Sequence, residues 1–133
     1  MNKNFFKKKK TLIIAEACDN HFGSIEKAKK MIIKAKKSGA DIIKFQHHIP
    51  DEEMLKKVPK SKNFKMSLYN FLKKYAFSID DHYKLKEFCK INSIEYLCTP
   101  FSYKAAKELN EIGVKFFKVG SGEFTDLMFI DKL

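Results

Sequence analysis

Arginine is absent from this sequence. All 27 basic side chains are lysines, and with 16 acidic residues they leave a net charge of +11. A charge of this sign suggests an acidic partner such as nucleic acid. Arginine, however, is the residue that most often makes the planar, bidentate contacts by which proteins read bases and phosphates. Lysines spread over solvated helix faces therefore explain the charge better than nucleic-acid binding, whose affinity would fall steeply with salt.

The sequence also lacks long apolar runs and paired cysteines. No stretch approaches the roughly 20 apolar residues of a membrane span, and the apolar run at residues 11–15 is too short for the core of a signal peptide. Three cysteines, Cys18, Cys89 and Cys98, are odd in number and show no CxxC spacing, which fits a reducing compartment. We therefore expect a cytoplasmic protein with no membrane contact, in which residues 1–10 form a basic, solvated tail.

The sequence contains a regular alternation of short apolar runs and helical patterns. Apolar runs at residues 12–16, 41–46, 94–98 and 115–119 predict four strands, of which the first has the continuous β-branched character of a strand covered on both faces. Helices are predicted to begin after Ser24, Ser78 and Ser102, and two of them end at Gly39 and Gly113. Strand–helix–strand units in this order predict an α/β fold with a parallel sheet.

The remaining segments are less regular. Residues 47–65 form a long connection, residues 68–75 are predicted as a short helix, and residues 125–133 have the pattern of a helix that is just beginning. On the helix that starts after Ser78, we assign His82 to the surface.

Polar residues follow every predicted strand at its carboxyl end, where parallel α/β proteins bind their ligands. They are Glu16 with Asn20 and His21, then Lys44 with Gln46, then Thr99, and finally Lys118 with Ser121 and Glu123. Lys44 and Lys118 each stand five residues after a glycine that ends a helix. Two lysines at the ends of two such strands indicate a site for an anion.

These residues occur in motifs that resemble the sialic acid synthase family. The motifs are Ile14-Ala15-Glu16 with Asn20-His21-x-Gly23, Ser38-Gly39-Ala40-Asp41 with Lys44-Phe45-Gln46, Thr99-Pro100-Phe101, and Phe117-Lys118-Val119-Gly120-Ser121-Gly122-Glu123. Each motif alone is weak, but all four occur in the family's order and spacing. Cys18 stands where the family usually has a glycine.

The resemblance implies a (β/α)8 TIM barrel, of which residues 11–133 would form the first four βα units, the N-terminal half of the synthase domain. Four strands cannot close an eight-stranded barrel. The C-terminal half of the barrel and a small antifreeze-like domain would be missing. We therefore expect a truncated chain that is inactive or barely active alone, whose full-length parent is a homodimer.

The resemblance also implies the chemistry of a transferase. The family condenses phosphoenolpyruvate with N-acetylmannosamine or a related acylamino sugar to a nonulosonic acid such as N-acetylneuraminate, and releases phosphate. By resemblance, the phosphoenolpyruvate ligands would be Lys44, Thr99, Lys118 and Ser121, with Gln46 on the acceptor sugar, Asn20 as a further substrate-binding residue, and Glu16 and Glu123 as the catalytic acid/base residues. The sequence does not decide which carboxylate is the base.

A divalent metal, Mn²⁺ or Mg²⁺, would hold the sugar aldehyde, but the family's metal ligands lie in later strands, so no residue here is assigned to it. His47 and His48 are adjacent on an extended chain and should point to opposite sides, with at most one of them near the sugar. An alternative remains open, in which the chain is a non-catalytic half-barrel that assembles with itself or with a partner chain.

Overall fold

The computed structural model describes residues 11–57, 59–60, 62 and 65–133, so the predicted basic tail at residues 1–10 lies outside the described residues. The fold is α/β, as predicted. Its three parallel strands lie in chain order across the sheet and are β1 (Ile14–Glu16), β2 (Ile42–His47) and β3 (Glu95–Pro100). The helices are α1 (Ile25–Lys37), α2 (Pro50–Glu53), α3 (Leu68–Tyr75), α4 (Ile79–Ile91), α5 (Tyr103–Glu111) and α6 (Leu127–Asp131), with the 3₁₀ helix η1 (Glu123–Thr125) before α6.

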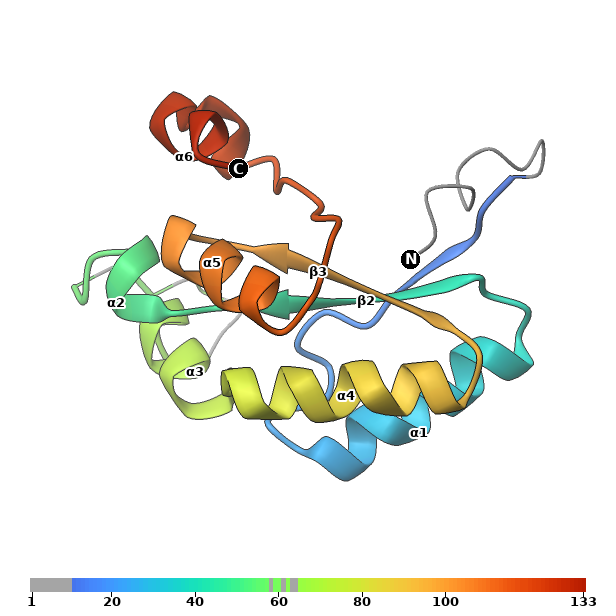
Figure 1. Ribbon diagram of the computed structural model, residues 1–133. Coiled ribbons are helices and arrows are strands. Elements are labelled where there is room, and N and C mark those ends of the chain that lie inside the picture. Colours follow the sequence, from blue (N-terminus) through green and yellow to red (C-terminus); the bar gives the residue numbers. More distant parts are fainter. Residues whose placement is uncertain (1–10, 58, 61, 63–64) are drawn as a thin grey trace.

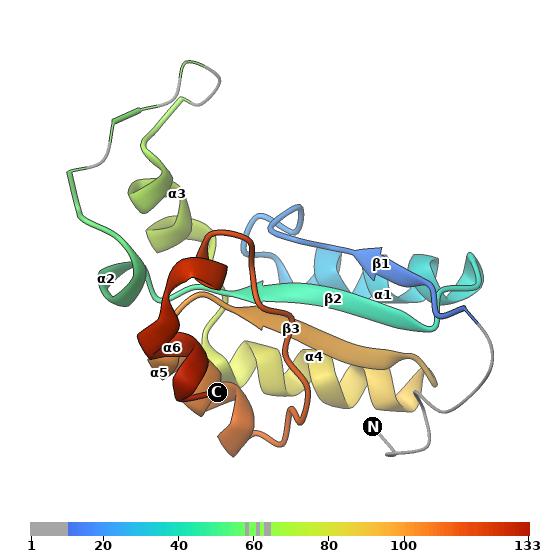
Figure 2. The same ribbon diagram turned by 90° about the horizontal axis from the view of Figure 1, so that it is seen from above.

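One face of the sheet is covered by helices α1 and α4, which lie beneath it in Figure 1 and next to one another behind the strands in Figure 2. Ile43 and Phe45 of β2 and Cys98 of β3 belong to the apolar core on this side. Helices α1, α4 and α5 contribute apolar side chains to that core, namely Ala28, Ile32, Leu85, Cys89 and Leu109. Because side chains alternate along a strand, Ile42 and Lys44 of β2 face the other way. Among the described residues, no helix is long and apolar enough to cross a membrane.

The helices begin and end where the sequence predicts. Ser24, Ser78 and Ser102 each accept a hydrogen bond from the backbone N–H three residues on, and Ser78 forms a capping box with Asp81. After α1, Gly39 has a φ of +85°, which a residue with a Cβ rarely adopts. The ends of these helices, from which the chain passes to the next strand, are therefore determined by local sequence.

Strand β1 differs from its prediction. It is only three residues long and pairs with β2, and its side chains are not covered on both faces. Ile13 is 54% exposed and Ile14 is 43% exposed, whereas Ala15 packs against the core. The prediction failed because a continuous apolar run does not tell an inner strand from a strand at the edge of a sheet.

The fourth predicted strand, at residues 115–119, does not form as an extended strand. Phe117 makes an isolated parallel bridge with Cys98, and the Lys118 N–H donates to the Cys98 carbonyl at 3.2 Å. A strand requires a ladder of such bonds, and the described chain instead continues into η1 and α6. In Figure 1, α6 lies on the side of the sheet opposite α1 and α4.

His82 lies in the core, so its assignment to the surface is wrong. Its side chain is 0% exposed, and its Nδ1 lies 2.6 Å from the Tyr96 hydroxyl. His82 precedes Leu85 by three residues and Cys89 by seven, which places all three on the buried side of α4. This spacing in the sequence could have identified it.

His21 is also buried. It lies in the loop after β1 and packs against the chain just before α4. Its Nδ1 accepts a hydrogen bond from the Gly23 N–H at 3.0 Å, and its ring stacks on Phe77 with the ring centres 3.7 Å apart. Burial lowers the pKa of His21 to about 4, lowers the pKa of His47, and lowers the pKa of His82 well below its usual value. These three imidazoles are therefore neutral near neutral pH.

We predict that Leu85→Ala lowers the free energy of unfolding by about 2–5 kcal/mol, because it removes a fully buried side chain beneath the sheet. Ile91→Ala on the same helix is the matched control. Ile91 is 79% exposed, so its loss should change stability by less than about 0.5 kcal/mol. Urea unfolding followed by circular dichroism measures both, and similar losses in the two variants would contradict the described core.

We also predict that stability falls as the pH falls. The folded chain binds fewer protons than the unfolded chain, whose histidines have pKa values of about 6.5. The contribution of His21 is therefore complete above that value and is lost as the pH falls toward about 4. His21→Asn, which retains an acceptor for the Gly23 N–H, should remove about 2 kcal/mol of the stability difference between about pH 7.5 and about pH 5. An unchanged pH dependence in this variant would show that His21 is not protonated on unfolding.

Candidate functional site

Glu16 and Lys44 form an ion pair between the first two strands. They are direct partners in the parallel register of β1 and β2, and the Lys44 Nζ contacts Glu16 Oε1. Lys44 is only 7% exposed, whereas about half of the Glu16 side chain is open to solvent. A buried ammonium group requires a compensating partner, and Glu16 supplies the charge. Lys44 lies in the middle of β2, not at its end as predicted, because the strand continues to His47.

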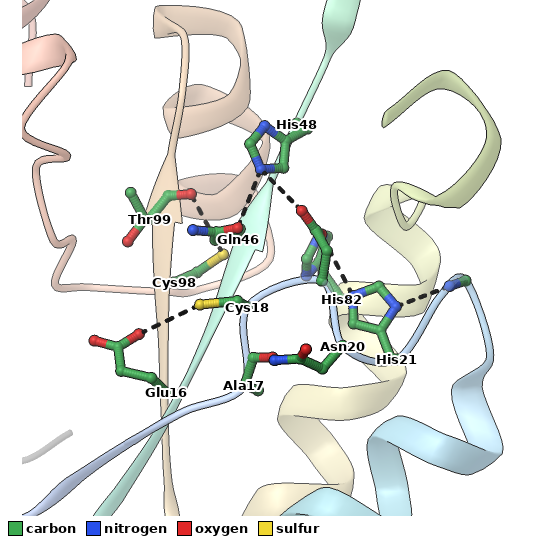
Figure 3. A network of polar contacts seen from close by, with 12 residues as sticks. Glu16, Ala17, Cys18, Asn20, His21, Gln46, His48, His82, Cys98 and Thr99 are labelled. Atoms are coloured by element: carbon green, nitrogen blue, oxygen red, sulfur yellow. Dashed lines mark hydrogen bonds and ion pairs between the residues drawn. The ribbon is translucent and has the colours of Figure 1, made fainter. Parts of the chain in front are cut away.

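Gln46 and Thr99 lie on the same face as this ion pair, toward the carboxyl ends of β2 and β3. They are partners in the register of the two strands, and Gln46 is two residues beyond Lys44. Thr99 is buried, and Gln46 is partly exposed. The parallel register thus brings four of the predicted residues onto one face of three adjacent strands, which Figure 3 shows from close by for Glu16, Gln46 and Thr99.

Lys118 belongs to the chain segment that runs beside β3. The side chain of Phe117 packs against the core on the helical side of the sheet. Lys118 is exposed, and the described contacts join its backbone, not its ammonium group, to β3.

Ser121 and Glu123 lie further along this segment. Ser121 is exposed. The Glu123 carboxylate folds back against Gly120, where an added Cβ would meet Glu123 Oε2. Glu123 also lines a cleft of about 480 Å³ that Phe101 and Ser102 border. Lys44 and Thr99 are not among the described residues that line this cleft.

Asn20 is occupied within its own loop. Its Nδ2 donates to the Ala17 carbonyl at 2.9 Å, and Figure 3 shows its side chain turned toward that residue. This hydrogen bond stabilises the turn after β1. A contact between Asn20 and substrate stays a prediction.

The two adjacent histidines after β2 point to different partners, as predicted. His47 Nε2 lies 2.8 Å from Glu108 Oε2 of α5, and the His47 ring lies beside that of His82. His48 instead contacts Glu53 and Gln46. The alternation of side chains along the extended chain accounts for this division.

A polar network around His48 is the feature that the sequence analysis missed. His48 Nδ1 lies 3.0 Å from Glu53 Oε1, and His48 Nε2 lies 3.3 Å from Gln46 Oε1 and 3.5 Å from Asp19 Oδ2. The ring stacks on Phe101 with the ring centres 4.1 Å apart. In Figure 3 the His48 ring stands between Gln46 and the loop that carries Asn20 and His21. Glu53 follows His48 by five residues, a separation that no simple motif marks.

Cys18 does not provide a nucleophile. Burial, followed by the charges of Glu16 and Asp19, raises the pKa of its thiol. Burial also raises the pKa of Cys89 to about 12 and raises that of Cys98. All three cysteines are free thiols that stay protonated near neutral pH.

The arrangement is chemically suited to an anion. A buried ammonium group, a threonine hydroxyl and an amide lie on one face of the parallel sheet, beside the partly exposed carboxylate of Glu16. A second cleft, of about 790 Å³, lies at the amino ends of β2 and β3 between Gly39, Ser93 and Gly113, and it contains none of the predicted site residues.

Comparisons with known proteins agree with the resemblance found in the sequence. The N,N'-diacetyllegionaminic acid synthase of Campylobacter jejuni is 39% identical over 131 residues, which cover 94% of this chain and 39% of that protein. The protein of the same name from Legionella pneumophila is 37% identical over 89% of this chain and 35% of its own length. Human N-acetylneuraminate-9-phosphate synthase is 33% identical over 90% of this chain and 35% of its own length. The chain thus spans well under half the length of these relatives.

A solved structure supports the same relationship. The N-acetylneuraminic acid (sialic acid) synthetase of Leptospira borgpetersenii, in complex with citrate, superposes with a TM-score of 0.78 at 29% identity, over 91% of this chain and 40% of that one. The model of the NeuB family matches residues 31–133. This match includes β2, β3 and all of the predicted site residues except Glu16 and Asn20. The chain therefore belongs to the NeuB family, whose members compared here include synthases of sialic and legionaminic acids.

Proposed function

We propose that this chain supplies the phosphoenolpyruvate-binding part of a nonulosonic acid synthase. The enzyme would be a transferase that joins phosphoenolpyruvate to N-acetylmannosamine or a related acylamino sugar and releases phosphate. The observation that carries the proposal is the buried Lys44, paired with Glu16 on the face that also holds Gln46 and Thr99. Relatives named as synthases of legionaminic acid and of N-acetylneuraminate 9-phosphate support it.

In this proposal, Lys44 exchanges its contact with Glu16 for a contact with the substrate. Phosphoenolpyruvate carries a phosphate and a carboxylate, and such anions bind where charged and hydroxyl donors converge. Thr99 donates its hydroxyl from the neighbouring strand, and Lys118 and Ser121 add donors from the exposed side. Because Lys44 is almost fully removed from water, its attraction for an anion is stronger than that of a surface lysine.

Glu16 and Glu123 are the proposed acid/base residues. Displacement of Lys44 by the substrate leaves Glu16 able to accept or donate a proton. Glu123 Oε2 is buried and has no hydrogen-bond partner among the described residues, so it is available to the water that adds at C2 of phosphoenolpyruvate. Phosphate would then leave by cleavage of the C–O bond. Because interacting ionisable groups exchange protons as a set, the proposal assigns the acid/base role to Glu16 and Glu123 together.

The fold proposed for the whole synthase is an eight-stranded βα barrel, with residues 11–133 as the N-terminal half of the domain. The helix-covered face of the described sheet corresponds to the outside of such a barrel and the face of Lys44 to its inside. A further strand beside β1 would cover the exposed Ile13 and Ile14. The complete protein would add the antifreeze-like domain and form a homodimer.

The proposal includes a divalent metal, Mn²⁺ or Mg²⁺, which would hold the sugar aldehyde and polarise its carbonyl. Within the described ranges of the chain, no group of three or more His, Cys, Asp or Glu side chains is arranged to bind a metal ion. The residues described here do not fit the metal, and its ligands would come from other parts of the synthase.

We predict that Lys44→Met lowers kcat/KM for phosphoenolpyruvate by about 10²- to 10³-fold, since it removes the buried charge but keeps the length of the side chain. The measurement is phosphate release by a full-length synthase that carries this sequence. Lys107→Met on the exposed side of α5 is the matched control and should change the rate by less than about twofold. Equal losses in the two variants, or full activity of a folded Lys44→Met enzyme, would argue against the proposed site.

We also predict that the same full-length synthase needs a metal. Phosphate release from phosphoenolpyruvate and N-acetylmannosamine should stop when a chelator removes divalent ions and return when Mn²⁺ or Mg²⁺ is added. Either substrate alone should release no phosphate. Undiminished release in the presence of the chelator would contradict the metal requirement.

A further inference from the structure

His48 is surrounded by two carboxylates, which accept hydrogen bonds, and by the side-chain amide of Gln46, which can donate or accept one. Its Nδ1 lies 3.0 and 3.1 Å from the two carboxylate oxygens of Glu53 on α2. Its Nε2 lies 3.5 Å from the Asp19 carboxylate, in the loop after β1, and 3.3 Å from Gln46 Oε1 on β2. The ring is 19° from parallel to Phe101, which follows β3. Four different segments thus hold one imidazole.

Oxygen atoms that can accept hydrogen bonds face both ring nitrogens of His48. A neutral imidazole has one donor and one acceptor nitrogen, and an acceptor nitrogen facing a carboxylate would be repelled. Glu53 lies on one side of the ring and Asp19 and Gln46 Oε1 lie on the other, so the geometry is satisfied when both ring nitrogens donate. His21, the other histidine beside Asp19, has a pKa lowered to about 4 and is neutral, so it does not neutralise Asp19.

The orientation of Gln46 follows from the protonation of His48. A protonated Nε2 can contact the carbonyl oxygen of the Gln46 side chain but not its NH₂ group, because two donors repel each other. The Gln46 oxygen is therefore held by His48, and its NH₂ group is left for the partly exposed face shared with Thr99. A rotated amide would place donor against donor.

We propose that His48 is a positioning residue that fixes the side-chain amide of Gln46, so that Gln46 acts as a hydrogen-bond donor to an oxygen of the acylamino sugar, either a hydroxyl or the N-acyl carbonyl. This proposal rests on the synthase function proposed above. It assigns to His48, Glu53 and Asp19 the task of orienting a substrate contact, although none of the three touches the substrate.

The first test measures the protonation of His48 in this chain and does not depend on any activity. Long-range ¹H–¹⁵N correlation spectra of the imidazole groups should show both nitrogens of His48 protonated near neutral pH. Glu53→Gln should shift this signal toward the neutral form. Glu52→Gln, which removes the exposed neighbouring carboxylate that pairs with Lys104, is the matched control and should leave the signal unchanged. A neutral His48 in the parent chain would overturn the proposal.

The second test measures kinetics in a full-length synthase that carries this sequence. His48→Phe, which keeps the stacking on Phe101, and Glu53→Gln should each raise KM for the acceptor sugar by about tenfold, the loss expected for one oriented hydrogen bond. KM for phosphoenolpyruvate should stay within about twofold, and Glu53→Asp should restore part of the sugar affinity. Equal increases in both KM values would indicate a structural role only and overturn the proposal. Absence of phosphate release in the parent enzyme would count against the synthase function, while the spectra would still decide the state of His48.

Discussion

The ion pair of Lys44 with Glu16 is the interaction on which the candidate site depends. It joins two adjacent parallel strands, and it keeps a charged ammonium group in a position from which water is almost excluded. Such a group is stable only while a partner neutralises it, and Glu16 is exposed enough to be replaced by an incoming anion. In the proposed function, the same contact holds Lys44 ready for the substrate. In the proposed reaction it would also link substrate binding to the release of a catalytic carboxylate.

A second layer of polar contacts lies between this pair and the helices. Neutral, buried His21, His47 and His82 lie near His48, which contacts carboxylates from α2 and from the loop after β1. Their surroundings differ, because aromatic rings pack against His21 and His82 whereas carboxylates flank His48. These contacts reach Gln46, which lies on the partly exposed face of the sheet that also holds Thr99.

Much of the fold could be predicted because it is encoded locally. Serine caps, glycines with positive φ and periodic apolar residues gave the helix positions, and the strand–helix order gave the parallel sheet. Two predictions failed for the same reason. The exposure of β1 and the single bridge at Phe117 depend on what lies beside each strand, and an apolar run contains no information about its neighbours. His82 was different, since its spacing from Leu85 and Cys89 already indicated burial.

The sequence by itself determined membership of the family, because its motifs occur in the family's order and spacing, and the same motifs single out Glu16, Lys44, Thr99 and Lys118 as candidate site residues. Only the tertiary structure decided which of these residues meet. The parallel register pairs Glu16 with Lys44 and Gln46 with Thr99, while Glu123, which folds back against Gly120, lines a cleft whose described residues include neither Lys44 nor Thr99. The network of His48, Asp19 and Glu53 likewise depends on three segments converging in space, and a contact between segments far apart in the chain leaves no local pattern in the sequence.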